Sequence, residues 1–208
     1  MKNKDFNALA KRILPDLPGF VIKSPMVFAS PVSHALRGLY FEGSDFDKES
    51  FCVWAFFVPL YVPTRHVSFT FGKRLAELGG GTRWKASATN LTTELGAAVK
   101  REALPFLSGI NSPRAIARAA MSVEGRQNPY VQEALAYSLA RAGDIDEAVG
   151  ALDQLISLLD GKLSWQRDMA DRAQVLKDRL VANPSEAQQQ LEAWQEESVS
   201  NLGLEAFR

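Results

Sequence analysis

The sequence predicts an α+β protein, with an antiparallel sheet and a flanking helix over residues 1–89 and an all-α helical-hairpin domain over residues 90–208. The prediction rests on a change in composition along the 208 residues. Residues 1–105 hold 14 of the 20 aromatic residues and 7 of the 10 prolines, whereas the remainder is rich in Ala, Leu, Gln and Glu. Aromatic residues favour strands, and Ala, Leu, Gln and Glu favour helices. The formal charge changes as well, from +5 over residues 1–105 to −5 over residues 106–208.

The N-terminal part is expected to begin with a helix capped by Asp5. The apolar residues Phe6, Leu9, Ala10 and Ile13 recur at helical spacing, which places them on one face. Runs typical of strands follow, separated by turn signals rich in Pro, Gly and Ser, and such short connections favour antiparallel pairing. These runs are Gly19–Ser24, Met26–Ser30, Ala35–Glu42, Phe51–Val62 and Arg65–Phe71.

The run Phe51–Val58 is apolar at every position, which predicts a central strand covered on both faces. Cys52 lies inside this run and is therefore expected to be a buried structural thiol. With one cysteine, the chain forms no intramolecular disulfide, which favours a reducing compartment.

Helix signals dominate after the strands. A short helix is expected at Lys73–Leu78 and a longer one from Asn90 to about Leu107. Several later helices should begin where a capping residue precedes proline or where Ser or Asp can cap, and glycines fit two helix ends. The expected starts are Ser112-Pro113, Asn128-Pro129, the capping box of Asp144 with Glu147, Ser164 and Asn183-Pro184, and the ends are Gly143 and Gly161.

Residues 130–159 carry a pattern that includes Leu135, Ala136, the turn Ala142-Gly143-Asp144, and Ala148. With these features the segment resembles a tetratricopeptide-type helical hairpin. It departs from that family where Asp160 replaces the closing proline and where Leu139 replaces an aromatic residue. No second copy follows at the family's spacing, so the later helices are expected to stack on the hairpin by packing alone. The resemblance implies binding of a protein or peptide.

The N-terminal part has a second resemblance. Its features are the opening helix, the segment Leu17-Pro18-Gly19-Phe20, and aromatic strands ending in Phe69-Thr70-Phe71-Gly72-Lys73-Arg74-Leu75. In this order they are similar to uncharacterised bacterial α+β domains, some of which are suspected to act as immunity proteins beside toxins. The resemblance implies a bacterial protein that binds and inhibits a partner.

Motifs for catalysis, metals and cofactors are absent from the sequence. There are two histidines and one cysteine, with no His-x-x-x-His or Glu-x-x-His spacing and no Gly-x-Ser-x-Gly. Gly79-Gly80-Gly81-Thr82 lacks the Lys and the flanking strand and helix of a P-loop. No metal and no cofactor are expected. The zero net charge and the lack of a recognised motif argue against nucleic acid as a partner.

Two candidate sites remain. The first is a partner-binding surface at Arg83, Trp84 and Lys85, where a large aromatic lies between two basic residues after a glycine loop. The alternative for Trp84 is burial against the sheet. The second candidate is a pocket between sheet and helices near His34, Arg65 and His66, which would suit an enzyme or a small-molecule binder.

The sequence therefore favours a non-enzymatic, protein-binding or immunity-type protein, with an enzyme or small-molecule binder as the alternative. No apolar run is long enough to span a membrane, and no secretory signal is evident at the N-terminus. These observations predict a cytoplasmic protein without a membrane partner. The oligomeric state and the identity of the partner stay open.

Overall fold

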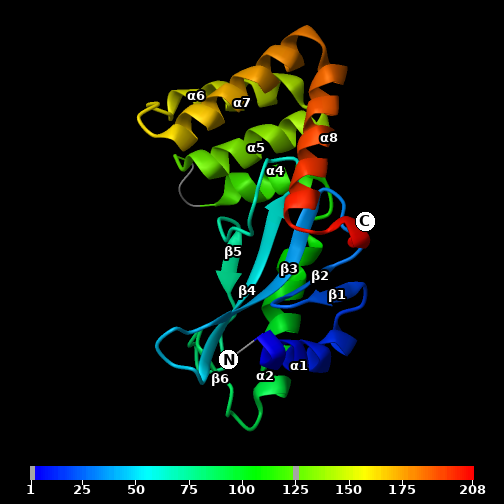
Figure 1. The fold of residues 1–208 in the computed structure, drawn as a ribbon, viewed down its shortest axis with the longest axis vertical. Helices are drawn as coiled ribbons and strands as arrows, with labels where there is room; N and C mark the ends of the chain where they lie inside the picture. The colour runs from blue at the N-terminus through cyan, green and yellow to red at the C-terminus, as the bar shows by residue number, and fades with distance from the viewer. Residues whose placement is uncertain (1–2, 124–126) are drawn as a thin grey trace. The chain divides into compact units, whose positions relative to one another are not determined.

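The computed structural model describes residues 3–123 and 127–208 and has the predicted α+β architecture (Figure 1). An antiparallel sheet forms in the N-terminal half, and helices dominate the rest. The chain divides into two compact units. The sheet unit contains the residues up to Val58, Phe71–Ile110 and Phe207–Arg208, and the helical unit contains Pro59–Thr70 and Asn111–Ala206. The boundaries of these units differ from the predicted domain boundary after residue 89. The helical segment 90–110 belongs to the sheet unit, and residues 59–70 belong to the helical unit.

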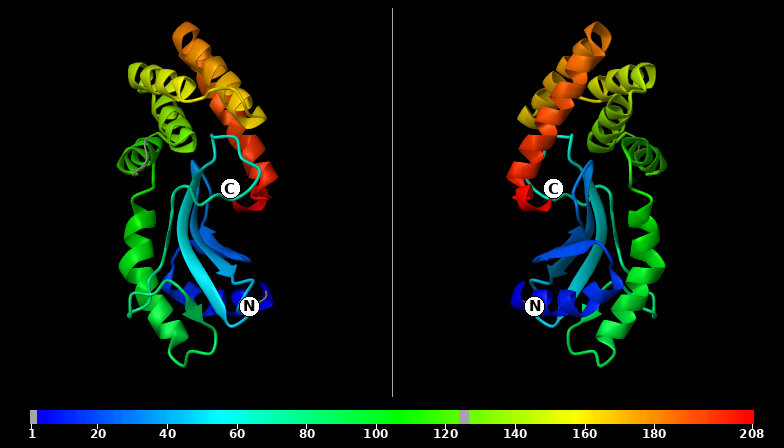
Figure 2. Two further views of the ribbon diagram at one scale, coloured as in Figure 1. Left: turned by 90° about the vertical axis from the view of Figure 1, so that its left-hand side faces the viewer. Right: turned by 90° about the vertical axis from the view of Figure 1, so that its right-hand side faces the viewer.

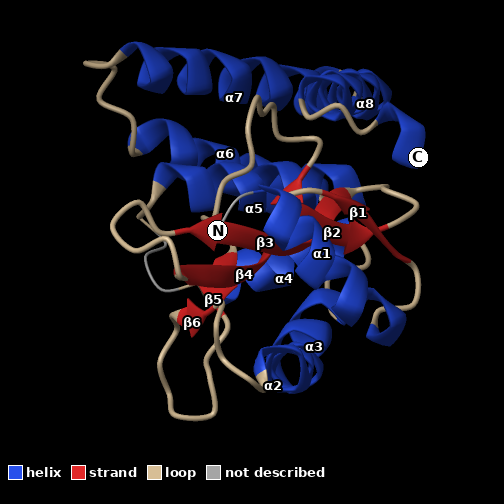
Figure 3. Cartoon of the chain, turned by 60° about the horizontal axis from the view of Figure 1, so that its bottom comes forward, coloured by secondary structure: helices blue, strands red, loops and turns tan. Residues whose placement is uncertain are grey.

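The sheet runs in the order β1-β2-β3-β4-β5, with β6 paired to β4 beside β5. Four of the expected strands are present, and β4 is an interior strand as predicted. The strands are β1 (Phe20–Lys23), β2 (Met26–Ala29), β3 (Ala35–Gly43), β4 (Ser50–Pro59), β5 (Gly72–Arg74) and β6 (Trp84–Lys85). Figure 3 shows β3, β4, β5 and β6 side by side with the loops that join them.

Two predictions after β4 are wrong. Arg65–Phe71 is not a strand, and the residue before this run, Thr64, bonds to the helix Pro184–Asn201 and not to a neighbouring strand. The amide of Thr64 donates to Oγ of Ser198 at 3.2 Å, and its carbonyl accepts from Nδ2 of Asn201 at 3.0 Å. Residues 73–78 do not form a helix. Instead, β5 pairs with residues 54–56 of β4, and the amide of Leu75 donates to the carbonyl of Val53 at 2.8 Å.

Helices cover one face of the sheet unit (Figure 2). Helix α1 (Asn3–Ile13) brings the predicted stripe Phe6, Leu9, Ala10 and Ile13 into the core, and Phe6 packs on Phe41 and Phe51. Asp5 lies within the first turn of α1 and not at its cap. A short 3₁₀ turn, η1 (Leu14–Asp16), follows α1.

The helix expected from Asn90 to Leu107 is present in three parts: α2 (Leu91–Ala98), a π-helical turn η2 (Val99–Ala103), and α3 (Leu104–Ser108). Proline has no amide hydrogen and its ring crowds the preceding turn. A π turn directly precedes Pro105, in which the amide of Leu104 donates to the carbonyl of Val99, five residues earlier. Pro105 then lies in the first turn of α3, where a missing amide hydrogen has little cost.

The helical unit consists of α4 (Pro113–Ser122), α5 (Pro129–Ala142), α6 (Ile145–Ser157), α7 (Ser164–Ala182) and α8 (Pro184–Asn201). Each helix packs on the next in the chain, and α5 also contacts α8. A last 3₁₀ turn, η3, spans Glu205–Phe207. The predicted caps are confirmed at three starts, because the side chains of Ser112, Asn128 and Asn183 accept bonds from the amides of Ala115, Tyr130 and Ser185.

The capping box predicted at Asp144 is wrong in its side-chain role. Helix α6 does begin after Asp144, and Gly143 has the left-handed φ of 82° that ends α5. The carboxylate of Asp144, however, accepts a hydrogen bond from Nε of Arg114 at 2.9 Å and does not cap the helix. The guanidinium of Arg114 lowers the pKa of Asp144, because a hydrogen-bonded cation favours the charged carboxylate.

Candidate partner-binding surface

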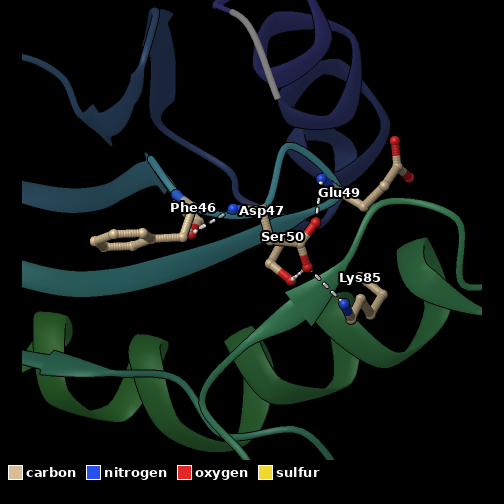
Figure 4. A network of polar contacts seen from close by, with 6 residues as sticks. Phe46, Asp47, Glu49, Ser50 and Lys85 are labelled. Atoms are coloured by element: carbon tan, nitrogen blue, oxygen red, sulfur yellow. Dashed lines mark hydrogen bonds and ion pairs between the residues drawn. The ribbon is translucent and has the colours of Figure 1, made fainter.

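The loop between β3 and β4 is held by a compact set of hydrogen bonds (Figure 4). The hydroxyl of Ser44 accepts from the amides of Phe46 and Asp47 at 3.3 and 3.2 Å. The carboxylate of Asp47 then accepts from the amide of Glu49 at 2.9 Å and from the hydroxyl of Ser50 at 2.6 Å. Short polar side chains that bond to nearby amides are typical of tight turns. The residues Gly43-Ser44-Asp45 are a turn signal in the sequence, and the hydrogen bonds of Ser44 and Asp47 restrain the loop that contains them.

Asp47 also connects this loop to β6. Its Oδ2 atom accepts a hydrogen bond from Nζ of Lys85 at 2.7 Å. The bonds from Lys85, Ser50 and the amide of Glu49 all favour the ionised carboxylate, and together they hold the pKa of Asp47 well below its usual range. Asp47 is thus charged at neutral pH and fixes the loop against a neighbouring strand.

Phe46 extends from this ordered loop with 98% of its surface exposed. Figure 4 shows its ring directed away from the carboxylate of Asp47. Solvent contacts nearly the whole ring, although the backbone amide that carries it is hydrogen-bonded to Ser44. The loop therefore presents a large, exposed apolar side chain from a hydrogen-bonded backbone.

Trp84, expected either as a contact residue or as a buried one, is buried. Its exposed fraction is 2%, and Nε1 donates to the carbonyl of Leu75 at 3.3 Å. It lies opposite Phe51 in the pairing of β6 with β4 and belongs to the apolar core. The indole thus anchors β6 to the sheet, while Arg83 and Lys85 on either side of it are exposed.

A polar group of three side chains lies across β3, β4 and β5. The Nε1 atom of Trp54 donates to Oε2 of Glu42 at 2.8 Å, and Nη2 of Arg74 lies 3.3 Å from the same oxygen. The guanidinium of Arg74 also lies over the Trp54 ring, 4.6 Å from its centroid. Trp54 and Arg74 are directly opposite each other in the strand pairing, so the register of β4 and β5 creates this contact.

A small pocket of about 140 Å³ lies beside this group. Its volume is below the range of about 300–1,000 Å³ that is usual for small-molecule sites. It is thus closer in size to a site for a single side chain. Among the residues that line it are Glu42, Asp45, Phe46, Cys52, Arg74 and Arg83. Cys52 itself is buried, as predicted, and its thiol is free.

The residues of the second candidate site are divided between the two units. His34 lies just before β3 in the sheet unit and is half-buried, whereas Arg65 and His66 are exposed in the helical unit. Arg65 and His66 lie in the loop that replaces the predicted strand. They form no part of the pocket near Phe46.

The sequence indicates Arg83 and Lys85 as partner-binding residues, which stays a prediction, and it does not single out Phe46 or Asp47. Paired acids in a turn, such as Asp45 and Asp47, are usually solvated, whereas Asp47 accepts hydrogen bonds that organise this turn. The only available signal was an aromatic residue within a turn of acidic and hydroxyl residues, Ser44-Asp45-Phe46-Asp47. An apolar residue has no conformational reason to occupy such a turn.

Comparison of this chain with known protein families, with curated proteins and with solved structures finds no match. Within residues 3–123 and 127–208, none of the helices has the length and apolar character to cross a membrane. The same described residues contain no group of three or more His, Cys, Asp or Glu side chains placed to hold a metal ion.

Proposed function

We propose that this chain is a non-enzymatic protein-binding protein, and that it contacts its partner through a surface formed by Asp45, Phe46, Arg83 and Lys85, here called the Phe46 surface. The observation that carries the proposal is the 98% exposure of Phe46 on a hydrogen-bonded loop. Aromatic side chains supply much of the binding energy at protein interfaces, because they bury a large area with few rotatable bonds.

The order of the loop supports this function. Association has an entropic cost for every segment that must become fixed. Here Ser44 and Asp47 hold the loop before any partner arrives, and Lys85 fixes it to β6. A partner would therefore meet Phe46 on a backbone that is already ordered, so less of the free energy of burying the ring is lost to ordering the loop.

Charged side chains beside Phe46 fit the same function. Arg83 and Lys85 flank the buried Trp84 and lie exposed in the sheet unit. Charges at the edge of an apolar contact increase the rate of encounter and exclude mismatched partners. In the immunity-type form of this proposal, which rests on the resemblance of the N-terminal part, the partner is a toxin.

The alternative, an enzyme or a small-molecule binder at His34, Arg65 and His66, stays a prediction. These residues belong to different compact units, and the pocket in the sheet unit is lined by other residues. The Phe46 surface is the better-supported site, because its residues come from one unit and the loop that carries Phe46 is hydrogen-bonded to Lys85 through Asp47.

The test compares Phe46→Ala with Leu78→Ala. Leu78 is a suitable control because it is another exposed large apolar residue in the sheet unit, with 71% of its surface accessible. The partner is first isolated by affinity purification from the native host and mass spectrometry, and its dissociation constant is then measured with each purified variant. Phe46→Ala should weaken binding by about 30-fold, which corresponds to a hot-spot cost of about 2 kcal/mol. Leu78→Ala should bind as the parent does.

Equal binding by the parent and Phe46→Ala would remove Phe46 as the contact. A direct check replaces Phe46 by the photoreactive p-benzoylphenylalanine, which keeps an aromatic ring at this position. Crosslinking to the partner from position 46 and not from position 78 would place the ring in the interface.

A further inference from the structure

The geometry points to a carboxylate-binding site in the pocket beside Phe46, in which Arg83 receives an acidic side chain of the protein partner. This inference rests on the proposed function, since it specifies which chemistry the partner brings to the Phe46 surface. Phe46 and Arg83 both line the pocket, so one partner segment can cover the ring and reach the guanidinium.

The two arginines of the pocket differ in the contacts that their guanidinium groups make. Arg74 is paired with Glu42 at 3.3 Å and stacked on Trp54, so its charge is already balanced. Arg83 is exposed, and across residues 3–123 and 127–208 it has no ion pair or side-chain hydrogen bond. Arg83 is thus the cation of the pocket whose donors are available to a ligand.

The chemistry of guanidinium favours an oxyanion as that ligand. Arginine offers a planar set of N–H donors that matches the two oxygens of a carboxylate, and such charge-assisted pairs are stronger than neutral hydrogen bonds. Water competes less at the wall of a pocket than on an open surface, which strengthens the attraction. Phe51 and Cys52 of β4 also line the pocket, and the rings of Phe51 and Phe6 pack together in the core.

The size and charge of the pocket select a singly charged group. Its volume of about 140 Å³ suits a side chain. Asp45 also lines the pocket, and its negative charge would repel a doubly charged phosphate more strongly than a singly charged carboxylate. A glutamate or aspartate side chain has both the size and the single negative charge that the pocket favours.

The charge of the whole sheet unit points to the same partner. This unit contains 14 basic and nine acidic residues, a net charge of +5. A basic surface attracts an acidic protein over distances of several ångströms and raises its association rate. We therefore assign the pocket to an acidic segment of a protein partner.

The test requires no identified partner. The full chain, labelled with ¹⁵N, is titrated at low ionic strength with N-acetyl-glutamate α-amide, and with N-acetyl-glutamine α-amide as the neutral analogue of equal shape. The carboxylate probe should shift the Nε–H resonance of Arg83 and the amides of Gly43 and Ser44, which line the same pocket. The neutral probe should bind at least about 10-fold more weakly, the effect of losing one charge-assisted pair.

Matched variants identify the residue responsible. Arg83→Gln should abolish the shifts at Gly43 and Ser44. Arg118→Gln should preserve them, because Arg118 is an exposed arginine of α4 in the helical unit, outside the pocket. Phe46→Ala should also preserve binding of the probe, which is too small to need the ring.

Four results would overturn the inference. They are equal shifts at Arg83 and Arg118, retention of the pocket shifts in Arg83→Gln, tighter binding of inorganic phosphate, or selective binding of N-acetyl-lysine α-amide beside Asp45. Concentration-dependent self-association that Arg83→Gln removes would assign the pocket to a second copy of this chain instead. The dissociation constant of the isolated partner with Phe46→Ala is measured independently of these titrations. Failure of the carboxylate site and failure of the protein-binding proposal are therefore distinguishable.

Discussion

The ammonium group of Lys85 lies 2.7 Å from Oδ2 of Asp47, and this ion pair joins β6 to the loop between β3 and β4. Both side chains are partly exposed, so the pair by itself contributes little to the stability of the fold. Its effect is on position, because Asp47 also accepts bonds from Ser50 and Glu49 within the loop. The pair thereby orders the segment that presents Phe46.

The first prediction concerns the pH dependence of this loop. The pKa of Asp47 in the folded protein lies below the ordinary value of 3.8, chiefly because Lys85 donates to it. A carboxyl group with a lowered pKa stabilises the fold above its unfolded pKa and loses this contribution as the pH falls. Asp47→Asn should therefore be less stable than the parent at pH 7, and the difference should shrink below about pH 4.

Chemical denaturation at several pH values measures this difference. Asp45→Asn is the matched control, because Asp45 is a neighbouring exposed carboxylate that takes no part in the hydrogen bonds of Asp47. A difference between the parent and Asp47→Asn that stays constant from neutral to acidic pH would contradict the assigned role of the charge.

The second prediction concerns Trp84. Because the indole is buried and packs in the core of the sheet unit, Trp84→Ala should destabilise the protein by about 3–5 kcal/mol, the range for deleting a large buried aromatic. Trp84→Phe should be less severe, since it keeps most of the apolar volume. The measurement is the free energy of unfolding in denaturant. A value for Trp84→Ala close to that of the parent would show that the ring does not hold β6 to the sheet.

The third prediction concerns Gly38 on β3. A Cβ atom at this position would lie 2.2 Å from the carbonyl oxygen of Val27 and 2.7 Å from Cα of Phe28, both backbone atoms of the paired strand. Backbone atoms cannot retreat without breaking the pairing. Gly38→Ala should thus cost at least about 1–3 kcal/mol, as overpacked sites do.

Gly81→Ala provides the control for Gly38. No atom lies within 4 Å of the position that its Cβ would take, so its stability should change by no more than about 0.5 kcal/mol. Thermal unfolding of the two variants side by side checks the contrast. Similar melting temperatures for Gly38→Ala and Gly81→Ala would exclude the close strand contact.

The fourth prediction concerns the ion pair of Glu133 and Arg172 inside the helical unit. Nη2 of Arg172 lies 2.9 Å from Oε1 of Glu133. Glu133 is buried, and this burial raises the pKa of its carboxyl group. Arg172→Ala should cost about 3–5 kcal/mol, because it leaves a buried acid without its cation. Adding Glu133→Gln should recover part of the loss, since the second change removes the unpaired charge.

Lys177→Ala serves as the control for Arg172, because Lys177 lies on the same helix and pairs with Asp153 at the surface. Its cost should be no more than about 1 kcal/mol. Denaturant unfolding of all three variants gives the comparison. Equal losses for Arg172→Ala and Lys177→Ala would indicate that burial does not distinguish the two pairs.

The elements that could be predicted from the sequence are those with local causes. Ser112, Asn128 and Asn183 cap their helices because each side chain reaches an amide two or three residues ahead. Gly143 ends α5 because its left-handed conformation has little cost for glycine. The stripe of α1 likewise follows the period of the helix, and the unbroken apolar run of β4 is typical of a strand buried on both faces.

The failures occurred where distant partners competed for the same groups. Asp144 has the sequence of a cap, yet Arg114 in an earlier helix takes its carboxylate. Thr64 precedes a run that reads as a strand, yet its backbone bonds to Ser198 and Asn201 of α8. Local propensity is worth a few tenths of a kcal/mol to about 1 kcal/mol per residue, so long-range contacts of similar strength can override it.

The sequence by itself determined the α+β class, the starts of the capped helices and the burial of Cys52, because each depends on composition or on neighbours within one or two turns. Only the tertiary structure decided the fates of Trp84 and Phe46. In the sequence both are aromatic residues close to charged neighbours, outside the clear strand and helix patterns. In the structure β6 pairs with β4 and buries Trp84, whereas Asp47 and Lys85 hold a loop that leaves Phe46 exposed. Whether a ring is buried depends on contacts between segments that are distant in the chain. The sequence near Trp84 or Phe46 therefore does not predict its burial.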